Sequence, residues 1–462
     1  MDTQQAYEHK REALVRELAR INASHNGAGT AAGIRLDKPN SNLFRTRQQS
    51  GVRKLDVRAL DQVVSVDRAG LTAVVAGMTT YEDLADATLR YGVLPTVVPE
   101  LATITIGGAV SGGGIEASSF RYGLVHETVL EMEVLLGDGR IVTATPNNEY
   151  ADLFFGLPNS FGTLGYILKL TVRLVEAKRY VRVRHRRFVR SDRYFGAIAG
   201  VVDSGRFEDE PVDFMDGMVR KGELYLTLGD FVESAPYTSD YTYRRIYYRS
   251  IPERREDYLT TRDFIWRWDP DWFWCSKAFG LQNPVLRLLG GKWLLHSKAY
   301  WWMSKMERKL NLAQKLARFR KGGPVRETVI QDVQIPVDRA EEFLSFFTRE
   351  IGINPVWICP TRSADPTVRY PLYPLDPSVT YVNFGFWDSV PTTPEREPNH
   401  LNRLLEREVT RLGGRKGLYS HSYYPPEEFW DLYDRAAYQA LKAKYDPEGR
   451  FKDLYAKVVG GA

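Results

Sequence analysis

Short alternating runs of apolar and polar residues fill the first 177 residues, and helical patterns interrupt them. A helix is predicted over residues 81–92, because Thr79 or Thr80 can cap it, acidic residues occupy its first turn and Gly92 ends it. Two further helices are predicted at residues 1 to about 25 and 149–158. The alternating runs predict strands at residues 55–60, 63–68, 72–78, 127–136, 140–145 and within 160–175.

From Lys178 onward, arginine and aromatic residues become more frequent, and a second set of elements is predicted. Strands are expected at residues 178–190, 223–232, 327–337, 354–361 and 380–388. Helices are expected at residues 339–352, 400–413 and 426–445, the last ending at Asp446-Pro447. Residues 237–323 hold most of the tryptophans and are expected to be helical or irregular. This order predicts an antiparallel sheet with helices on one face.

Together these patterns predict the α+β fold class, and a chain of 462 residues is long enough for several domains. We expect four divisions: an N-terminal helix (1–25), a nucleotide-binding domain (26–177), a substrate domain (178–425) and a C-terminal segment (426–462).

Composition narrows the class of protein. Hydrophobic residues make up 43% and charged residues 26%, which is typical of a soluble globular protein. We find neither an apolar run long enough to span a membrane nor a secretory signal in the charged N-terminal residues. Cys275 and Cys359 lie far apart, which argues against a disulfide framework and for a reducing, cytoplasmic compartment. The seven histidines show no ligand spacing, so no metal site is expected.

The stretch Pro99–Gly139 carries the clearest chemical signal. It places Gly107, Gly108, Gly112, Gly113, Gly114 and Gly123 among small hydroxyl residues and then enters a strand. Glycine lets the backbone approach a ligand closely, and successive free N–H groups can bind an anion. We therefore expect a pyrophosphate here. A nicotinamide-type fingerprint is not indicated, because such a motif follows a strand and opens a helix.

A basic stretch over residues 301–323 has two interpretations. Trp302, Met306 and Leu310 recur at helical spacing among many Lys and Arg residues. Such a helix can lie in a lipid interface, at the inner face of a membrane for a cytoplasmic protein, or it can pack on the domain core or on another subunit. Nucleic-acid binding is not expected, because no recognised motif accompanies these cations.

The motif order VAGMTTYEDL, LPTVVPELATITIGGAVSGGGIEASSFRYGLV, EVLLGDGRIV and SFGTLGYI resembles the FAD-binding domain of the vanillyl-alcohol-oxidase-type (PCMH-type) flavoproteins. Through VIQDVQIPV, NPVWICP, LYSHSYYPPEEFWDLYD and KYDPEGRF the chain is similar to Δ24-sterol reductases and their actinobacterial relatives. IRLDKPNSNLFR also resembles enzymes proposed to reduce a methylene-branched fatty acyl chain. The resemblance implies a two-lobed FAD-binding domain, a substrate (cap) domain and a C-terminal segment that returns to the flavin domain.

Carried over residue by residue, the resemblance implies flavin contacts in three places. The first is the loop Ser41, Asn42, Leu43, Phe44 and Arg45. The second comprises Thr105, Ile106, Gly107, Gly108, Gly112, Gly114, Ile115, Ser118 and Ser119. The third is the turn holding Gly162, Gly165 and Ile167. Because the first loop has no histidine and the offset of His126 does not match the usual attachment position, non-covalent FAD is expected.

Candidate catalytic residues follow from the chemistry of C=C reduction, which needs a hydride at one carbon and a proton at the other. Tyr419, His421 and Tyr423 alternate and could share one side of a strand, where a Tyr–His pair could relay a proton. Gln331 and Asp332 interrupt an apolar strand and could orient flavin or substrate. Aromatic packing and structural hydrogen bonding are the respective alternatives.

The resemblance implies FAD-dependent reduction of a lipid C=C bond, with NADPH or NADH as a transient electron donor. The expected lipid is a methylene-branched acyl chain or a Δ24-sterol-like substrate. The alternative is an oxidase or dehydrogenase of an alcohol, sugar or hydroxy acid, and a flavin-free binding protein is a third class. A homo-oligomer and a methyltransferase partner are left open.

Overall fold

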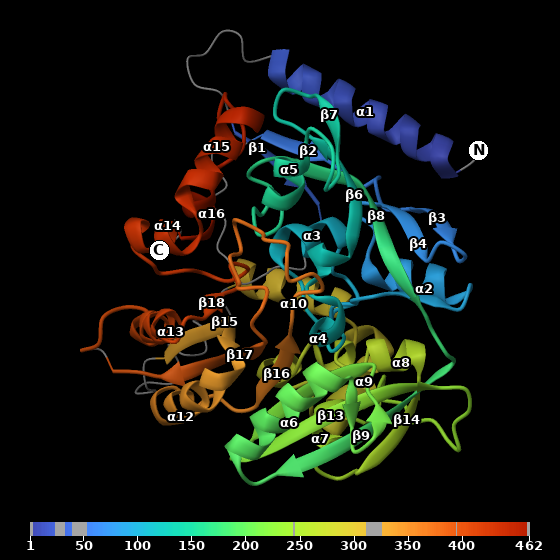
Figure 1. The fold of residues 1–462 in the computed structure, drawn as a ribbon, viewed down its shortest axis with the longest axis vertical. Coiled ribbons are helices and arrows are strands. Elements are labelled where there is room, and N and C mark those ends of the chain that lie inside the picture. Colours follow the sequence, from blue (N-terminus) through green and yellow to red (C-terminus); the bar gives the residue numbers. More distant parts are fainter. Residues whose placement is uncertain are drawn as a thin grey trace.

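The computed structural model describes residues 3–23, 33–38, 53–243, 245–310, 326–393 and 395–459. Within these residues two large antiparallel sheets lie one above the other in the view of Figure 1. This mixture of helix and sheet agrees with the α+β class. The predicted loop Ser41–Arg45 lies outside the described residues, as do residues 311–323 of the basic stretch. The predicted domain boundaries stay predictions.

The upper sheet has six strands in the order β3-β4-β8-β6-β7, with β5 also paired to β8. Their bounds are β3 Val63–Asp67, β4 Thr72–Ala76, β5 Val93–Pro95, β6 Val129–Leu135, β7 Ile141–Ala144 and β8 Tyr166–Glu176. A separate parallel pair is formed by β1 Ile34–Asp37 and β2 Arg53–Asp56. The strand predicted at residues 55–60 overlaps β2, but no strand was predicted at β1.

The helices of this upper part are short, apart from the first. They are α1 Thr3–Ala23, α2 Tyr81–Leu89, α3 Ile106–Gly112, α4 Ser119–Tyr122, the 3₁₀ turn η1 Val125–Thr128 and α5 Ala151–Gly156. The cap predicted for α2 is present, since the Thr80 hydroxyl accepts a hydrogen bond of 3.1 Å from the Asp83 amide. The α1 helix lies along the outer edge of the molecule, where Tyr7 bonds to the Glu133 carboxylate of β6.

The lower sheet has eight strands in the order β14-β9-β13-β12-β16-β17-β15-β18. Their bounds are β9 Tyr180–Phe188, β12 Phe214–Arg220, β13 Glu223–Val232, β14 Glu256–Thr260, β15 Arg326–Pro336, β16 Val356–Thr361, β17 Tyr381–Pro391 and β18 Arg415–Lys416. A small hairpin is formed by β10 Arg206–Phe207 and β11 Glu210–Pro211. All of these pairings are antiparallel, as the sequence predicted.

Two copies of a β-α-β-β unit meet in the middle of this sheet, and no repeat was visible in the sequence. One unit is β9, α6 (Ser191–Ser204), β12 and β13; the other is β15, α12 (Ala340–Glu350), β16 and β17. The units join where β12 pairs with β16. The long helices α6, α12 and α13 (His400–Arg411), with the 3₁₀ turn η4 (Val337–Arg339), cover one face around a single apolar core.

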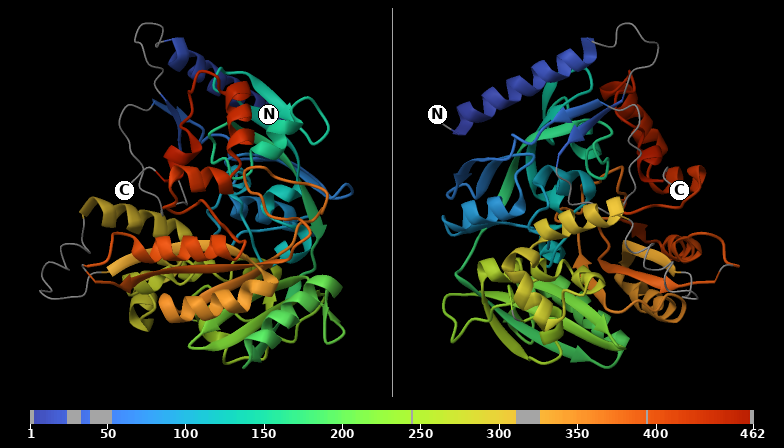
Figure 2. Two further views of the ribbon diagram at one scale, coloured as in Figure 1. Left: turned by 60° about the vertical axis from the view of Figure 1, so that its left-hand side comes forward. Right: turned by 180° about the vertical axis from the view of Figure 1, so that it is seen from behind.

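The tryptophan-rich segment packs near the other face of the sheet. Apart from strand β14, its described residues (237–243 and 245–310) are helical or irregular, as expected. It contains α7 Tyr247–Ser250, α8 Thr261–Ile265, the 3₁₀ turns η2 Asp269–Asp271 and η3 Cys275–Phe279, and the longer helices α9 Pro284–Leu294 and α10 Ser297–Leu310. In all three views α10 lies at the level between the two sheets (Figure 1, Figure 2).

The last helices pack against the upper sheet although they follow the lower one in sequence (Figure 2). They are α14 Pro426–Leu432, α15 Arg435–Tyr445 and α16 Leu454–Val458. The predicted continuous helix is wrong here, because Asp434 adopts a left-handed conformation and caps α15 with its own side chain. Lys442 of α15 donates to the Thr163 carbonyl, and Tyr445 donates to Asp152.

Candidate active site

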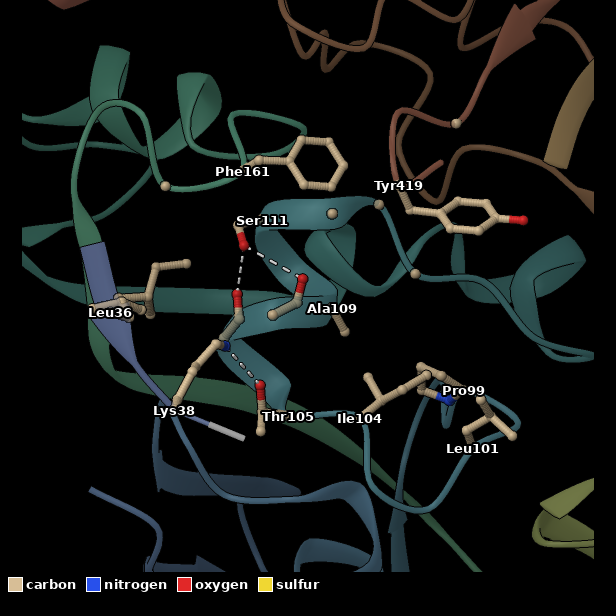
Figure 3. Close-up of a pocket in the computed structure, with 18 of the residues that line it drawn as sticks. Leu36, Lys38, Pro99, Leu101, Ile104, Thr105, Ala109, Ser111, Phe161 and Tyr419 are labelled. Carbon is tan, nitrogen blue, oxygen red and sulfur yellow. Dashed lines mark hydrogen bonds between the residues drawn. The ribbon is translucent and has the colours of Figure 1, made fainter. Parts of the chain in front are cut away.

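A cavity of about 650 Å³ is lined by residues from both sheets (Figure 3). This volume lies within the range of small-molecule and cofactor sites. The upper part of the protein contributes β1, the glycine-rich stretch and the turn at residues 161–167. The lower part contributes β15, β16, β17 and the residues after β18, while the tryptophan-rich segment closes a further side.

The first wall is made mainly of backbone. Most of the predicted flavin contacts line the cavity: Thr105, Gly107, Gly108, Gly112, Gly114, Ile115, Gly162, Gly165 and Ile167. The expectation of a continuous loop is wrong in one respect, because Ile106–Gly112 form the short helix α3. Figure 3 shows Thr105 at the start of this helix and Phe161 near its other end.

Three of the predicted contacts do not line the cavity. Ile106 is buried in the upper core. The Ser118 hydroxyl donates to the Thr96 carbonyl at 2.7 Å, and the Ser119 hydroxyl accepts from the Glu116 amide at 3.1 Å. These serines therefore stabilise the backbone conformation of the stretch, because their hydroxyls form hydrogen bonds with neighbouring backbone groups.

Two glycines in this wall have no room for a side chain. A Cβ on Gly77 would lie 2.2 Å from the Ile167 carbonyl oxygen, and one on Gly107 would lie 2.8 Å from the Gly77 carbonyl oxygen. Three backbone segments thus pack directly against one another beside the cavity. A larger residue would push one of them into the space that a ligand needs.

Cations gather where β1 meets the glycine-rich stretch. Arg35 and Lys38 line the cavity, and Lys38 Nζ lies 3.5 Å from the Thr105 hydroxyl. Lys452 and Lys457 line it from the C-terminal segment. Glycine backbone beside several cations suits a phosphorylated ligand, because both the amide groups and the side chains favour negative charge.

The opposite wall holds a hydrogen-bonded polar cluster. The Asp332 carboxylate accepts from Asn383 Nδ2 at 2.7 Å and from the Tyr419 hydroxyl. Trp387 Nε1 in turn donates to the Tyr419 oxygen at 2.8 Å. Gly385 makes room for this arrangement, since a Cβ there would lie 2.6 Å from Asp332 Oδ1.

The electrostatics of this cluster favour neutral forms. Burial raises the pKa of Asp332 to about 6, although the hydrogen bonds from Asn383 and Tyr419 oppose the shift. Burial and the neighbouring Asp332 charge raise the pKa of Tyr419 well above its usual range. Glu100 also lines the cavity, and burial together with Glu116 raises its pKa strongly. The cavity therefore holds acids that titrate near neutral pH or remain protonated.

Three of the candidate catalytic residues lie elsewhere. Gln331 points to the other face of β15, where its amide donates to Asn402 Oδ1 at 2.8 Å, because adjacent strand residues face opposite sides. His421 and Tyr423 line a second cavity of about 490 Å³ on a different side. The alternation expected for Tyr419, His421 and Tyr423 fails because residues 417–425 form no strand. Asp332 and Tyr419 alone among the five reach the main cavity.

Several cavity residues were not anticipated from the sequence: Glu100, Asn383, Trp387, Trp272 and Tyr300. One signal was available, because Asn383 interrupts the apolar strand predicted at residues 380–388 and shares a face with Trp387. His126, which was considered for flavin attachment, is buried against Tyr370 and does not line the cavity. Burial lowers its pKa to about 3.

Comparison with known proteins identifies the ligand that suits this cavity. Residues 38–145, which include α3 and the glycines from Gly77 to Gly114, match the family model of an FAD binding domain. The chain is a PCMH-type FAD flavoprotein. As such it is an oxidoreductase that binds FAD.

This flavoprotein is related to the Δ24-sterol reductases. It is 29% identical to the Δ24-sterol reductase of Rattus norvegicus over 389 residues, covering 79% of this chain and 70% of the rat protein. It is 28% identical to that of Homo sapiens over 420 residues, covering 87% and 77%. Cytokinin dehydrogenase 7 of Oryza sativa subsp. japonica is 30% identical over 240 residues, covering 49% and 43%.

The residues present fit this cofactor. The absence of side chains on Gly77 and Gly107 lets three backbone segments pack together beside the cavity, so that this wall is mainly backbone that can approach a bulky planar or phosphorylated group closely. The cations Arg35 and Lys38 suit the pyrophosphate, and the turn at Gly162–Ile167 borders the same space. Whether the flavin is held non-covalently stays a prediction, because the loop Ser41–Arg45 lies outside the described residues.

Proposed function

We propose that the protein reduces an isolated C=C bond of a lipid, with FAD reduced by NADPH or NADH as the source of electrons. The named activity of its relatives from rat and human supports this class of reaction. The aromatic side chains of the lower sheet and of the tryptophan-rich segment support an apolar substrate. Those that line the cavity are Trp272, Phe273, Tyr300, Trp357 and Trp387.

The observation that carries the proposal is the acid cluster opposite the glycine wall. Bound FAD supplies hydride to one carbon of the double bond, so the other carbon needs a proton from the protein. Asp332 faces the cavity and its pKa of about 6 leaves a useful protonated fraction near neutral pH. We assign proton donation to Asp332, and Tyr419 and Asn383 hold its carboxyl group in place.

For the substrate we favour a methylene-branched fatty acyl chain over a Δ24 sterol. The support is the resemblance of IRLDKPNSNLFR to the proposed methylene-acyl reductases. Reduction would convert the C=CH2 branch of such a chain into a methyl branch.

The test is anaerobic mixing of the purified holoprotein with NADPH and then with NADH, followed by the absorbance of oxidised flavin. Rapid bleaching by either nucleotide supports the proposal. The bleached protein is then mixed with a methylene-acyl lipid or a Δ24 sterol, and the acceptor that restores the absorbance is the substrate class. If neither nucleotide bleaches the flavin but an alcohol does, the protein is a dehydrogenase or oxidase and the proposal is wrong.

A further inference from the structure

Helix α9 has the reverse of the burial pattern that is usual for a surface helix. One of its two cations, Arg287, is only 4% exposed, and its guanidinium donates to Asp271 Oδ1 at 2.6 Å and to the Tyr243 carbonyl. Its leucines point outward, with Leu288 63% exposed and Leu289 77% exposed. In water such a helix would normally bury its leucines and expose its arginine.

Four neighbouring residues make up the exposed apolar surface of this helix: Val285, Leu286, Leu288 and Leu289, here called the α9 patch. Residues 285, 288 and 289 share one helical face, because positions three and four apart are neighbours on a helix. The buried ion pair between Arg287 and Asp271 fixes the helix in this orientation. The patch is therefore held outward by the fold.

The α9 patch is connected to the active-site cavity through a small apolar cluster. Leu294 of α9 packs against a cluster that contains Trp272, Leu281 and Tyr300. Trp272 and Tyr300 are also lining residues of the cavity. On the neighbouring helix α10, Trp302 and Met306 are exposed as well. One segment thus borders the cavity on its inner side and offers apolar side chains to the outside.

Charge identifies the occupant of this surface. Besides the buried Arg287 and Lys298, which pairs with Glu82, the sequence of residues 284–325 has eight Lys and Arg residues and a single acidic residue, Glu307. Lys277, just before α9, is exposed. Apolar residues among cations complement a bilayer surface that carries anionic lipids. A second copy of this chain is disfavoured as the occupant, because a symmetric interface would bring the same cations together.

We propose that the α9 patch docks on an anionic lipid bilayer. Since no helix in the described part of the chain is long and apolar enough to cross a membrane, this docking is a surface contact. The four side chains enter the interface, and the basic composition of the segment favours anionic headgroups. A role in taking up substrate from the bilayer rests on the proposed function, because it requires a lipid substrate; the docking itself does not.

The experiment is sedimentation of the FAD-loaded full chain with vesicles of phosphatidylcholine, with or without phosphatidylglycerol. The wild-type protein should bind vesicles that contain phosphatidylglycerol more tightly, and added salt should weaken this preference. The double variant Leu288→Ser/Leu289→Ser should lower vesicle binding about tenfold or more, because two apolar side chains leave the interface.

The matched control is Tyr91→Ser/Val189→Ser, which removes two other exposed apolar side chains far from α9 in sequence. It should bind vesicles like the wild type. Unchanged flavin absorbance and thermal midpoint in both double variants show that they are folded. Equal vesicle binding by the α9 variant and the wild type, or no vesicle binding by the wild type, overturns the proposal. A wild-type dimer that the α9 variant converts to monomer assigns the patch to a second copy instead and also overturns it.

Bleaching of the flavin by NADPH in the absence of vesicles separates the two proposals. It should be the same in the wild type and the α9 variant, because the patch lies outside the cavity lining. Vesicle binding without bleaching by either NADPH or NADH would leave the docking supported and the proposed reductase function wrong.

Discussion

Arg267 donates a hydrogen bond of 2.8 Å to Glu116, a residue 151 positions earlier in the chain. The same nitrogen donates to Asp216 of β12 at 2.7 Å, and all three side chains are buried. Because Glu116 lies within the glycine-rich stretch, this triad ties the flavin wall to the lower sheet. Burial raises the pKa of Glu116 to about 7, although Arg267 opposes the shift.

Replacing this arginine should therefore destabilise the folded protein. We expect Arg267→Met to lower the free energy of unfolding by about 3–5 kcal/mol, because it removes the cation from two buried carboxylates, although Trp268 still donates to Asp216. The loss should be smaller at about pH 5 than at about pH 8, since burial raises the pKa of Glu116 to about 7 and its carboxylate is neutralised at the lower pH. Denaturant unfolding measures both. Arg262→Met, which breaks a half-exposed pair with Asp86, should cost at most about 1 kcal/mol; an equal loss in both variants would contradict the role of the triad.

The proton-donor assignment predicts a pH profile. Asp332 is protonated below its pKa of about 6, so turnover should fall as the pH rises through 6. Asp332→Asn should remove this limb together with most of the activity. In Tyr419→Phe the limb should move to higher pH, because the lost hydrogen bond lowers the pKa of Asp332 in the wild type.

His421→Ala serves as the control for this profile, since His421 lines the other cavity. Its turnover should keep the wild-type limb. If the turnover of Asp332→Asn still fell as the pH rises through 6, another group would be the proton donor, and Glu100 would be the next residue to replace.

The crowded glycine wall predicts a loss of cofactor. Gly77→Ala should release FAD during gel filtration, because the new methyl group would lie 2.2 Å from the Ile167 carbonyl oxygen. Flavin absorbance per mole of protein measures retention. Gly196→Ala in α6 has open space around it and should retain FAD, with stability unchanged or raised by about 0.5–1 kcal/mol. Full FAD retention by Gly77→Ala would show that this wall does not border the flavin.

The cations at β1 predict a salt-dependent affinity for FAD. Arg35→Gln and Lys38→Gln should each weaken FAD binding roughly tenfold at low salt, because each removes a charge-assisted contact to the pyrophosphate. Titration of the apoprotein with FAD measures the effect, and added salt should reduce the difference from the wild type. Lys54→Gln on β2, whose partner is Asp37, should bind FAD normally. A change of the same size in Lys54→Gln would point to general charge effects.

Local sequence signals identified many elements well. Strand β13 has the predicted bounds, and α2 has the predicted cap, because alternation and capping are properties of neighbouring residues. Strand β12 was missed because Asp216 and Gly217 interrupt its apolar pattern. Asp216 accepts a hydrogen bond from Arg267, a contact that forms only in the folded chain.

Some residues of the candidate site could likewise be predicted from neighbouring residues in the sequence, and others could not. The glycine wall could be identified because its residues are consecutive, and Asp332 could be identified because a carboxylate interrupts an apolar strand. Asn383, Trp387 and Glu100 reach the cavity only through the pairing of β15 with β17 and through tertiary packing. His421 and Tyr423 were grouped with Tyr419 on the assumption of a strand that does not form.

The return of the last helices to the upper sheet has a consequence for biosynthesis. Tyr438, Leu441, Tyr445 and Leu454 belong to the same apolar core as the residues of β6 and β8. The Ile34 amide of β1 donates to the Arg450 carbonyl at 2.8 Å. A nascent chain that has emerged from the ribosome only as far as the lower sheet lacks this part of the core. The flavin-binding half, although synthesised first, therefore completes its folding last.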